Sequence, residues 1–212
     1  MKILVTGTTG GVGGAVARAA REAGHEVVAF DRADFEALSR TSSFAAYPHD
    51  LSGLDALVFA TGCCPVAPLL RTDDTLFAET IKVNCGYFLS LVRSLVAERL
   101  YSPKGMRIVA VSSVSAVEGW AGGGAYCASK GALSALCRAL AVELKPRRIS
   151  ITVLEPRYIA TRMFRQGAGR MGAGLDEAVS PEAFAALVLR ALDDPAAAET
   201  APGGGTTGQD VV

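Results

Sequence analysis

Short apolar runs alternate along the chain with longer segments that carry apolar residues at helical spacing, and this alternation constrains the fold most strongly. The apolar runs are KILVT (2–6), EVVAF (26–30), ALVFA (56–60), RIVAVSS (107–113) and ISITVLEP (149–156). The helical patterns cover residues 11–24, 72–100, 125–145 and 181–193. Strands that alternate with helices form βαβ units, in which the strands are parallel and buried on both faces. The sequence therefore predicts an α/β fold with a doubly wound parallel sheet, in a single domain over residues 1–212.

The connection before the run at 56–60 is too short for this pattern. Only five residues separate Asp50 from that run, whereas a connection between parallel strands needs a dozen or more. Either another element covers that face of the sheet, or the third strand is displaced or missing. Further along the chain, the glycines of 201–209 (APGGGTTGQ) predict a loop before a short last strand.

The stretch VTGTTGGVGGAVA places Gly7, Gly11 and Gly13 between the first apolar run and the first helical pattern. Glycines at such a junction let the chain turn tightly and bring backbone N–H groups against a pyrophosphate at the helix N-terminus. Because the motif follows a strand and opens a helix, it predicts a dinucleotide site in a Rossmann-type fold. The alternative is that these glycines serve only the close packing of helix on strand.

Asp31 ends the second apolar run, where a carboxylate can accept hydrogen bonds from both hydroxyls of an adenosine ribose. Because a carboxylate there would repel the 2′-phosphate of NADP, the sequence favours NAD(H). Arg32 keeps NADP(H) open, since a guanidinium could bind that phosphate or stack on adenine. The simplest alternative is a solvated Asp–Arg turn.

Tyr126 precedes Lys130 by four residues at the start of a helical pattern, so the two side chains share one helix face. A free phenol, with a pKa of about 10, is a poor acid or base at neutral pH. A neighbouring ammonium stabilises the phenolate, and we expect Lys130 to lower the pKa of Tyr126. Ser112 or Ser113 would lie at the carboxyl edge of the sheet, where a hydroxyl can donate to a carbonyl oxygen.

These motifs together resemble the short-chain dehydrogenase/reductase family, of its classical type, in a shortened form. The match consists of T-G-x-x-x-G-x-G at Thr6, Gly7, Gly11 and Gly13, Y-x-x-x-K at Tyr126 and Lys130, a serine thirteen residues before the tyrosine at Ser113, Asn84 in IKVNCGYFLS, and Pro156, Ile159 and Thr161 in EPRYIAT. The resemblance runs from residue 1 to about 195. Four motifs in this order and at this spacing make it highly specific.

The resemblance implies an oxidoreductase that transfers a hydride between a nicotinamide cofactor and a secondary alcohol or carbonyl compound. It implies that Tyr126 is the general acid or base and that Ser113 orients the substrate oxygen. Lys130 would hold the nicotinamide ribose, and Asn84 would maintain a proton-relay water. The implied contacts to the cofactor are Thr6, Gly7, Gly11, Val12, Gly13, Asp31, Arg32, Asp50, Leu51, Ala60, Thr61, Gly62, Tyr126, Lys130, Pro156, Ile159 and Thr161. Among these, Asp50, followed by Leu51, resembles the acidic residue after the third strand that contacts adenine.

Two positions depart from the family pattern. Phe59-Ala60-Thr61-Gly62 stands where Asn-Asn-Ala-Gly is usual, and Arg157 replaces the glycine that usually follows the proline. Arg157 could bind a carboxylate or phosphate of the substrate, or it could point to solvent. We expect a substrate loop over about 157–180, rich in glycine, that orders on binding or is disordered without function. Trp120 and Tyr158 could be apolar walls of the pocket or ordinary packing.

The overall charge argues against a polyanionic partner. Twenty-one basic and 21 acidic residues give a formal charge of zero, whereas nucleic acids and anionic membranes select for a basic excess. No apolar run is long enough to span a membrane, and the first residues lack the regions of a signal peptide. We therefore expect a soluble cytoplasmic protein that acts on a small-molecule alcohol or ketone. The family resemblance implies a homodimer or homotetramer that pairs through 72–100 and 125–145.

The cysteines do not form a metal-binding pattern. They are Cys63, Cys64, Cys85, Cys127 and Cys137, and none of them makes a C-x-x-C motif. The only histidines, His25 and His49, are far from any cysteine pair in the sequence. We therefore expect no metal site and interpret the cysteines as small buried hydrophobic residues in a reducing compartment.

Two other functions stay open. A non-catalytic NAD(P)-binding sensor or regulatory protein is favoured by the departures at Phe59-Ala60 and Arg157 and opposed by intact Ser113, Tyr126 and Lys130. A sugar-nucleotide reductase or epimerase uses the same three residue types but usually adds a sizeable C-terminal substrate domain. Residues 157–212 are too few for such a domain.

Overall fold

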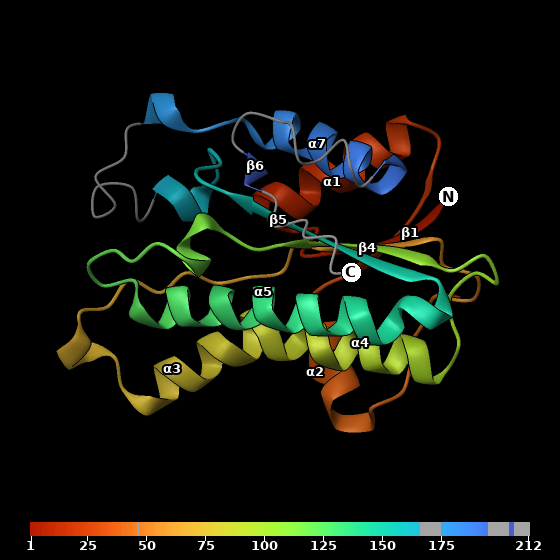
Figure 1. Cartoon of the computed structure of the whole chain (residues 1–212), viewed down its shortest axis with the longest axis horizontal. Coiled ribbons are helices and arrows are strands. Elements are labelled where there is room, and N and C mark those ends of the chain that lie inside the picture. Colours follow the sequence, from red (N-terminus) through yellow and green to blue (C-terminus); the bar gives the residue numbers. More distant parts are fainter. Residues whose placement is uncertain (46, 166–174, 195–203, 206–212) are drawn as a thin grey trace.

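Five parallel strands and one short antiparallel strand form a single sheet in the order β2-β1-β3-β4-β5-β6 (Figure 1). The computed structural model describes residues 1–45, 47–165, 175–194 and 204–205. The strands are β1 (Lys2–Thr6), β2 (Glu26–Phe30), β3 (Ala56–Phe59), β4 (Met106–Val111), β5 (Ile149–Pro156) and β6 (Gly204–Gly205). The five parallel strands confirm the predicted α/β, Rossmann-like fold.

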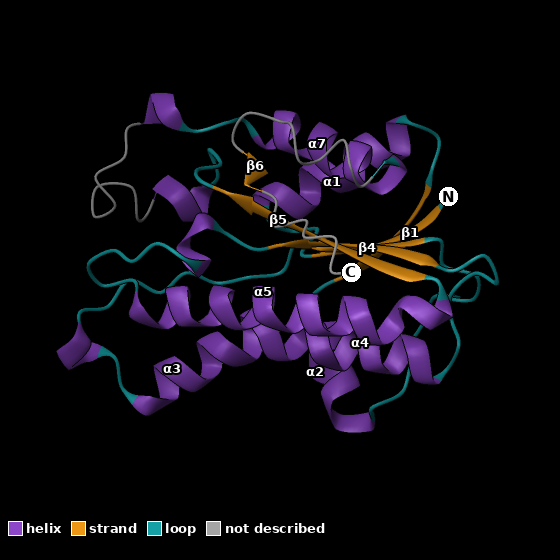
Figure 2. Ribbon diagram, in the orientation of Figure 1, coloured by secondary structure: helices purple, strands orange, loops and turns teal. Residues whose placement is uncertain are grey.

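Helices cover both faces of the sheet, as Figure 2 shows. One face carries α1 (Gly11–Glu22) and α7 (Pro181–Asp193), which pack against each other. The other face carries α2 (Arg32–Thr41), α3 (Asp74–Ile81), α4 (Tyr87–Ala97) and α5 (Gly124–Leu144). A π-helical turn (Lys82–Gly86) joins α3 to α4, and short 3-10 helices lie at Leu69–Arg71, Val114–Ala116, Lys145–Arg147 and Leu175–Glu177.

The pleat of the strands sends alternate side chains into two apolar cores. Ile3 and Val5 of β1 enter the core beneath α1 and α7, where Val188 is fully buried. Leu4 enters the opposite core together with Phe59. Because helices cover both faces of the sheet, the strands bury side chains on both faces and are continuous apolar runs in the sequence.

The crossover between β2 and β3 is made by α2, a helix that the sequence pattern did not predict. This ten-residue helix buries only Phe35 and Leu38, so its apolar periodicity is weak. Between α2 and β3, the described residues contain no strand beyond an isolated bridge at Leu54. The third strand is therefore missing in the described chain, and β2 forms the edge of the sheet.

The segment after α2 packs against this edge strand. The rings of Phe44 and Tyr47 lie 5.9 and 5.2 Å from the ring of Phe30, and the Tyr47 hydroxyl donates a hydrogen bond to the carbonyl of Ala29. An apolar lining and a hydrogen bond thus shield part of the β2 edge without a further strand.

The predicted strands at 2–6, 26–30 and 149–156 match β1, β2 and β5 at both ends. The helical pattern at 72–100 is interrupted by the π-helical turn. Gly204 and Gly205 pair with β5 inside the segment where the sequence predicts a loop. Residues 206–212, which include the predicted last strand, lie outside the described residues, as do residues 166–174 of the predicted substrate loop.

Candidate functional site

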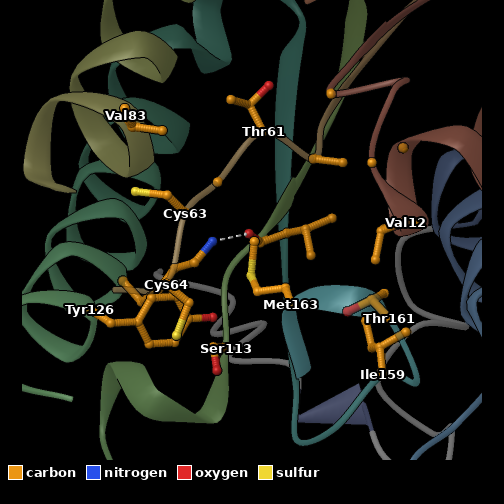
Figure 3. Close-up of a pocket in the computed structure, with 18 of the residues that line it drawn as sticks. Val12, Thr61, Cys63, Cys64, Val83, Ser113, Tyr126, Ile159, Thr161 and Met163 are labelled. Atoms are coloured by element: carbon orange, nitrogen blue, oxygen red, sulfur yellow. Dashed lines mark hydrogen bonds between the residues drawn. The ribbon is translucent and has the colours of Figure 1, made fainter. Parts of the chain in front are cut away.

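A cavity of about 900 Å³ lies at the carboxyl ends of the parallel strands, where doubly wound folds bind ligands (Figure 3). It brings together most of the residues expected from the sequence: Gly7, Gly11, Val12, Gly13, Asp31, Arg32, Ala60, Thr61, Gly62, Ser113, Tyr126, Lys130, Pro156, Ile159 and Thr161. Thr6, Asn84, Asp50 and Leu51 do not line it. The first two lie directly behind its wall, and the last two lie elsewhere.

The glycine-rich turn is tight enough to exclude side chains. Gly7 has a φ of +69°, and a Cβ at this residue would lie 2.9 Å from the carbonyl oxygen of Ala60. A Cβ at Gly13 would lie only 2.3 Å from the carbonyl oxygen of Gly7. The motif therefore serves close helix–strand packing, and it also leaves the N-terminus of α1 open to the cavity.

Thr6 joins the ends of two neighbouring strands. Its fully buried hydroxyl accepts hydrogen bonds from the backbone nitrogens of Ala60 at 3.0 Å and Thr61 at 3.1 Å. The chain after β3 is thereby fixed against the glycine turn. The Thr61 hydroxyl oxygen is itself buried and has no hydrogen-bond partner among the described residues.

Asp31 lines the cavity and has one buried oxygen without a hydrogen-bond partner among the described residues. Its Oδ2 accepts a hydrogen bond from the Thr8 hydroxyl at 2.6 Å, while its Oδ1 has no partner in the described part of the chain. An unpaired buried carboxylate oxygen is costly, and a hydroxyl donor from a bound ribose would satisfy it. The neighbouring Arg32 is exposed and forms an ion pair with Glu36 at 3.1 Å.

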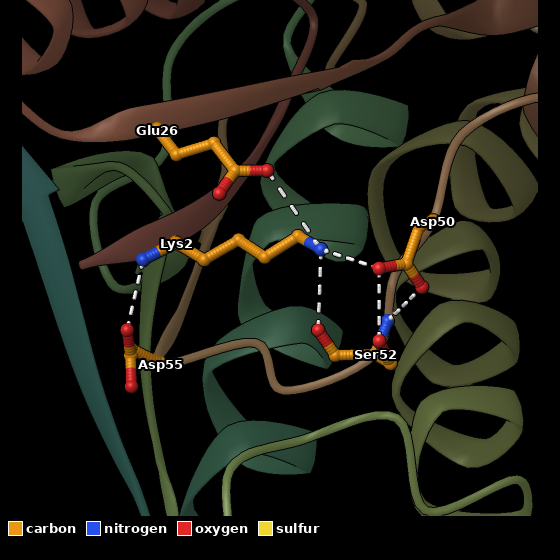
Figure 4. Close-up of polar contacts among 5 residues, drawn as sticks. All are labelled: Lys2, Glu26, Asp50, Ser52 and Asp55. Atoms are coloured by element: carbon orange, nitrogen blue, oxygen red, sulfur yellow. Dashed lines mark hydrogen bonds and ion pairs between the residues drawn. The ribbon is translucent and has the colours of Figure 1, made fainter.

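Asp50 lies beside the amino end of β1, among the polar contacts of Lys2 (Figure 4). The Asp50 carboxylate pairs with the amine of Lys2, the first residue of β1, at 3.1 Å, and accepts from the backbone nitrogen of Ser52 at 2.8 Å. These contacts, those from Ser52 first, lower the pKa of Asp50 to about 2. Leu51 is buried in the apolar core. Because the third strand is missing, neither residue reaches the cavity as expected.

Tyr126 and Ser113 meet at the floor of the cavity (Figure 3). Tyr126 lies in the first turn of α5, and Ser113 follows β4 two residues after the strand ends. Burial raises the pKa of the Tyr126 phenol well above its ordinary value, while a hydrogen bond with Ser113 acts in the opposite direction. The serine that meets the tyrosine is therefore Ser113. The Ser112 hydroxyl instead forms a hydrogen bond with the hydroxyl of Ser134 in α5.

Burial, not Lys130, dominates the pKa of Tyr126, so the lowering expected from the sequence is outweighed. The Lys130 amine donates a hydrogen bond to the carbonyl of Val111 at 2.8 Å and lies 5.9 Å from the centre of the Tyr126 ring. Burial lowers the pKa of Lys130 itself to about 8. The ammonium thus faces the ring, and removal from water has the largest effect on both groups.

Asn84 holds the wall of the cavity from behind. The fully buried amide lies in the π-helical turn, accepts a hydrogen bond from the backbone nitrogen of Cys63 at 2.8 Å and donates to its carbonyl at 2.9 Å. It also donates to the Ser129 hydroxyl at 2.7 Å, and Ser129 in turn donates to the carbonyl of Tyr126 at 2.7 Å. This chain connects the wall to the turn that carries the tyrosine. Ser129 had no signal of its own in the sequence beyond its position before Lys130.

The Arg157 guanidinium is paired at the rim of the cavity, so neither of the two expectations from the sequence describes it fully. It lines the rim and forms two hydrogen bonds with the Glu118 carboxylate, at 2.9 and 2.5 Å. Tyr158 also lines the cavity, with its ring 5.1 Å from that of Phe164. Trp120 is not among the lining residues and donates a hydrogen bond to Ser115.

Cys63 and Cys64 line the cavity, a position that their interpretation as buried hydrophobic residues did not include. Burial raises the pKa of Cys64 to about 11, so its thiol stays protonated at neutral pH. Among the described residues, no three histidine, cysteine, aspartate or glutamate side chains gather into a group that could hold a metal ion. None of the described helices combines the length and hydropathy that a membrane crossing requires.

Comparison with known proteins places these features in a family. Residues 3–186 match the family adh_short_C2, described as enoyl-(acyl carrier protein) reductase. Nodulation protein G of Rhizobium sp. (strain N33) is 29% identical over 188 residues, which cover 76% of this chain and 74% of that protein. L-xylulose reductase of Bos taurus is 28% identical over 179 residues, covering 76% of this chain and 73% of that enzyme.

The fold also matches solved structures. A 4-hydroxyisoleucine dehydrogenase mutant complexed with NADH and succinate superposes with a TM-score of 0.78, covering 93% of each chain at 22% identity. This likeness extends through nearly all of both chains and concerns the fold. Since the family match spans most of the sequence and the glycine turn, Ser113, Tyr126 and Lys130 line one cavity, the chain belongs to the short-chain dehydrogenase/reductase family of NAD(P)-dependent oxidoreductases.

Proposed function

We propose that the protein interconverts a secondary alcohol and a carbonyl compound with NAD(H), with Tyr126 as the general acid and base. The observation that carries this proposal is the meeting of Ser113, Tyr126 and Lys130 in the same cavity as the glycine-rich turn. A site for cofactor and a site for proton transfer are therefore adjacent, as hydride transfer requires.

The residues present fit a nicotinamide dinucleotide. The open N-terminus of α1 offers backbone N–H groups to a pyrophosphate, and the unpaired Oδ1 of Asp31 would accept from the adenosine ribose. Ile159 and Thr161 would hold the carboxamide end. When bound, the cofactor supplies or accepts the hydride. Asp31 and Arg32 both line the cavity; NAD(H) is favoured over NADP(H) because the Asp31 carboxylate would repel a 2′-phosphate while the Arg32 guanidinium is paired with Glu36.

The protein's own task is to position the substrate oxygen and to move one proton. In reduction, the Ser113 hydroxyl would donate a hydrogen bond to the substrate carbonyl, and the Tyr126 phenol would transfer its proton to that oxygen. In oxidation, the same oxygen of Tyr126 would take the proton back. Lys130 would bind the nicotinamide ribose, and Asn84 would keep the Cys63 wall and a proton-relay water in place.

One observation favours a second candidate, a cofactor-binding sensor without turnover. The high pKa of the buried Tyr126 phenol and the distance of the Lys130 amine from it make proton release from this geometry unfavourable. Such a protein would bind the cofactor and lack activity on every alcohol or ketone. Oxidation of an alcohol, by contrast, requires that the pKa of Tyr126 falls when cofactor and substrate are bound, because the phenolate must then act as the base.

The test compares the native protein with Tyr126→Phe. Calorimetric titration with NADH gives the cofactor affinity, and turnover is measured on a panel of ketones and secondary alcohols. We expect Tyr126→Phe to bind NADH as the native protein does and to lose at least about a hundredfold in kcat, the usual contribution of a general acid. Tyr101→Phe, outside the cavity, is the control and keeps full activity. Full activity in Tyr126→Phe would contradict the mechanism, and NADH binding without turnover of any substrate would support the sensor.

The cofactor preference is tested separately with Asp31→Ala. We expect the native protein to bind NADH more tightly than NADPH, and the variant to lose most of that difference because the carboxylate no longer repels the 2′-phosphate. Calorimetric titration of both proteins with both cofactors measures the two ratios. If the native protein already prefers NADPH, Arg32 governs the choice, and Arg32→Ala should then weaken NADPH binding.

A further inference from the structure

A second concave site lies at the amino ends of β4 and β5, whereas the cofactor cavity lies at the carboxyl ends of the strands. It has a volume of about 390 Å³ and is lined by Arg99, Arg147 and Arg148 together with Tyr101 and Pro146. The two loops that form it precede β4 and β5 and are joined by a hydrogen bond from the Met106 nitrogen to the Arg148 carbonyl. Since these parallel strands are six and eight residues long, the two sites are roughly 20 Å apart.

Basic residues are concentrated around this site, although the chain as a whole has no net charge. Residues 99–105 and 144–149 contain five basic residues and no acidic one, although the whole sequence has a formal charge of zero. None of the three lining arginines forms an ion pair or a side-chain hydrogen bond in the described part of the chain. In contrast, Arg18, Arg32 and Arg157 are each paired with a glutamate.

The backbone holds two of these arginines in an unfavourable conformation. Arg99 has a φ of +53° and Arg148 a φ of +58°, and only one other described residue besides glycine, Ser42, has a positive φ. Arginine does not favour this left-handed region, where glycine or asparagine would fit at lower cost. Both arginines follow the last turn of a helix, Arg99 after α4 and Arg148 after Lys145–Arg147, and a left-handed residue there ends the helix and turns the chain toward the hollow.

We propose that this site binds the pyrophosphate group of a small phosphorylated molecule. A guanidinium matches a phosphate with two parallel hydrogen bonds, and three around one hollow exceed what a single phosphate requires. The volume lies within the range of small-molecule sites. Tyr101, Pro103 and Pro146 supply an apolar and aromatic wall, against which a nucleoside attached to the pyrophosphate can pack.

The experiment titrates the full chain with inorganic pyrophosphate, ADP and adenosine by calorimetry at physiological salt. The variant Arg147→Gln/Arg148→Gly removes two guanidiniums, and glycine at 148 relieves the positive φ, so the fold is retained. We expect saturable binding of pyrophosphate and tighter binding of ADP to the native protein, both weakened at least tenfold in the variant. Adenosine alone should not bind at this site. Arg40→Gln, an exposed arginine on α2, is the matched control and keeps the native affinities.

Two outcomes would overturn the proposal. One is the absence of saturable pyrophosphate binding to the native protein. The other is undiminished affinity in the variant, which would assign the anion to the glycine turn at the other edge. NADH titration of the same variant separates this site from the proposed function. The variant leaves the glycine turn and Asp31 unaltered, so it should keep NADH binding at the cofactor cavity and lose only the NADH that binds at the arginines. If Arg147→Gln/Arg148→Gly does not fold, Arg99→Gly/Arg147→Gln serves as the second variant, with the same tenfold loss expected.

Discussion

Burial is the dominant influence on the two ionisable residues of the candidate active site. It raises the pKa of the Tyr126 phenol and lowers the pKa of the Lys130 amine to about 8, because both charged forms lose their hydration. Among the described residues, the lysine amine has one hydrogen-bond acceptor, the Val111 carbonyl. The folded chain therefore bears a cost for keeping Lys130 charged at neutral pH, and that cost is measurable as a dependence of stability on pH.

We predict that Lys130→Met gains stability relative to the native protein at pH 7 and loses this advantage by pH 10. Between pH 8 and the ordinary lysine pKa of 10.5, the unfolded chain keeps the proton and the folded chain releases it. The contribution of Lys130 to the free energy of unfolding therefore rises with pH in this window, by on the order of 2 kcal/mol from pH 7 to pH 10. Urea unfolding of both proteins at several pH values measures the difference. The exposed Lys104→Met is the control, and a pH-independent difference for Lys130→Met would show that the amine is not desolvated.

At the residue scale, sequence reasoning succeeds where the geometry is local. Tyr126, Lys130 and a serine, Ser112 or Ser113, could be placed together because strand ends and a four-residue helical spacing fix their positions, and the spacing of the resembled family selected Ser113. Asp50 could not be placed correctly, because its position depends on whether a third strand exists. The effect of Lys130 on Tyr126 could not be predicted either, since it depends on how deeply each group is buried.

At the scale of elements, the glycine turn sets how α1 approaches the sheet, and this gives a second prediction. Gly13→Ala would put a Cβ 2.3 Å from the Gly7 carbonyl oxygen and 2.6 Å from that of Thr6. Both contacts are to backbone, so α1 must move away, and we expect a loss of stability of about 2 kcal/mol or more together with weaker NADH binding.

The matched control is Gly124→Ala, in the first turn of α5. A Cβ there meets nothing within 4 Å, so alanine should be neutral or stabilising by up to about 1 kcal/mol through its higher helix propensity. Thermal unfolding compares the two variants, and NADH titration shows whether the site is affected. Equal effects of the two substitutions would mean that α1 is not held by close contact with the turn.

Two elements could not be predicted from apolar periodicity. Helix α2 buries only Phe35 and Leu38, and its start is indicated instead by Asp31, whose backbone nitrogen donates to the Asp34 carboxylate at 2.7 Å. The π-helical turn at Lys82–Gly86 shifts the helical register within a continuous apolar pattern. That shift brings Asn84 to the Cys63 backbone, so the element that sequence reading missed is the one that positions a site residue.

At the scale of the whole molecule, the outer surface of α4 and α5 bears on assembly. Leu89 on α4 is 41% exposed and Val142 on α5 is 61% exposed, and both are large apolar side chains. Apolar side chains on a helix face that the protein itself leaves uncovered favour pairing with a second copy. We propose that these two helices form the interface of the homodimer or homotetramer that the sequence leads us to expect.

We predict that the native protein has at least twice the mass of one 21.9 kDa chain in solution, as measured by light scattering after gel filtration. Leu89→Lys/Val142→Lys should shift it toward the monomer, because each copy would bring two charges into the interface. Leu69→Lys/Leu70→Lys is the matched control, since these leucines are 85% and 98% exposed but lie before α3, outside both helices. If the control variant dissociates and Leu89→Lys/Val142→Lys stays assembled, the interface lies at the Leu69–Arg71 turn instead. If the native protein is a monomer, the proposed assembly is wrong. If assembly is confirmed, NADH affinity of the monomeric variant decides whether the cofactor cavity is complete in one chain.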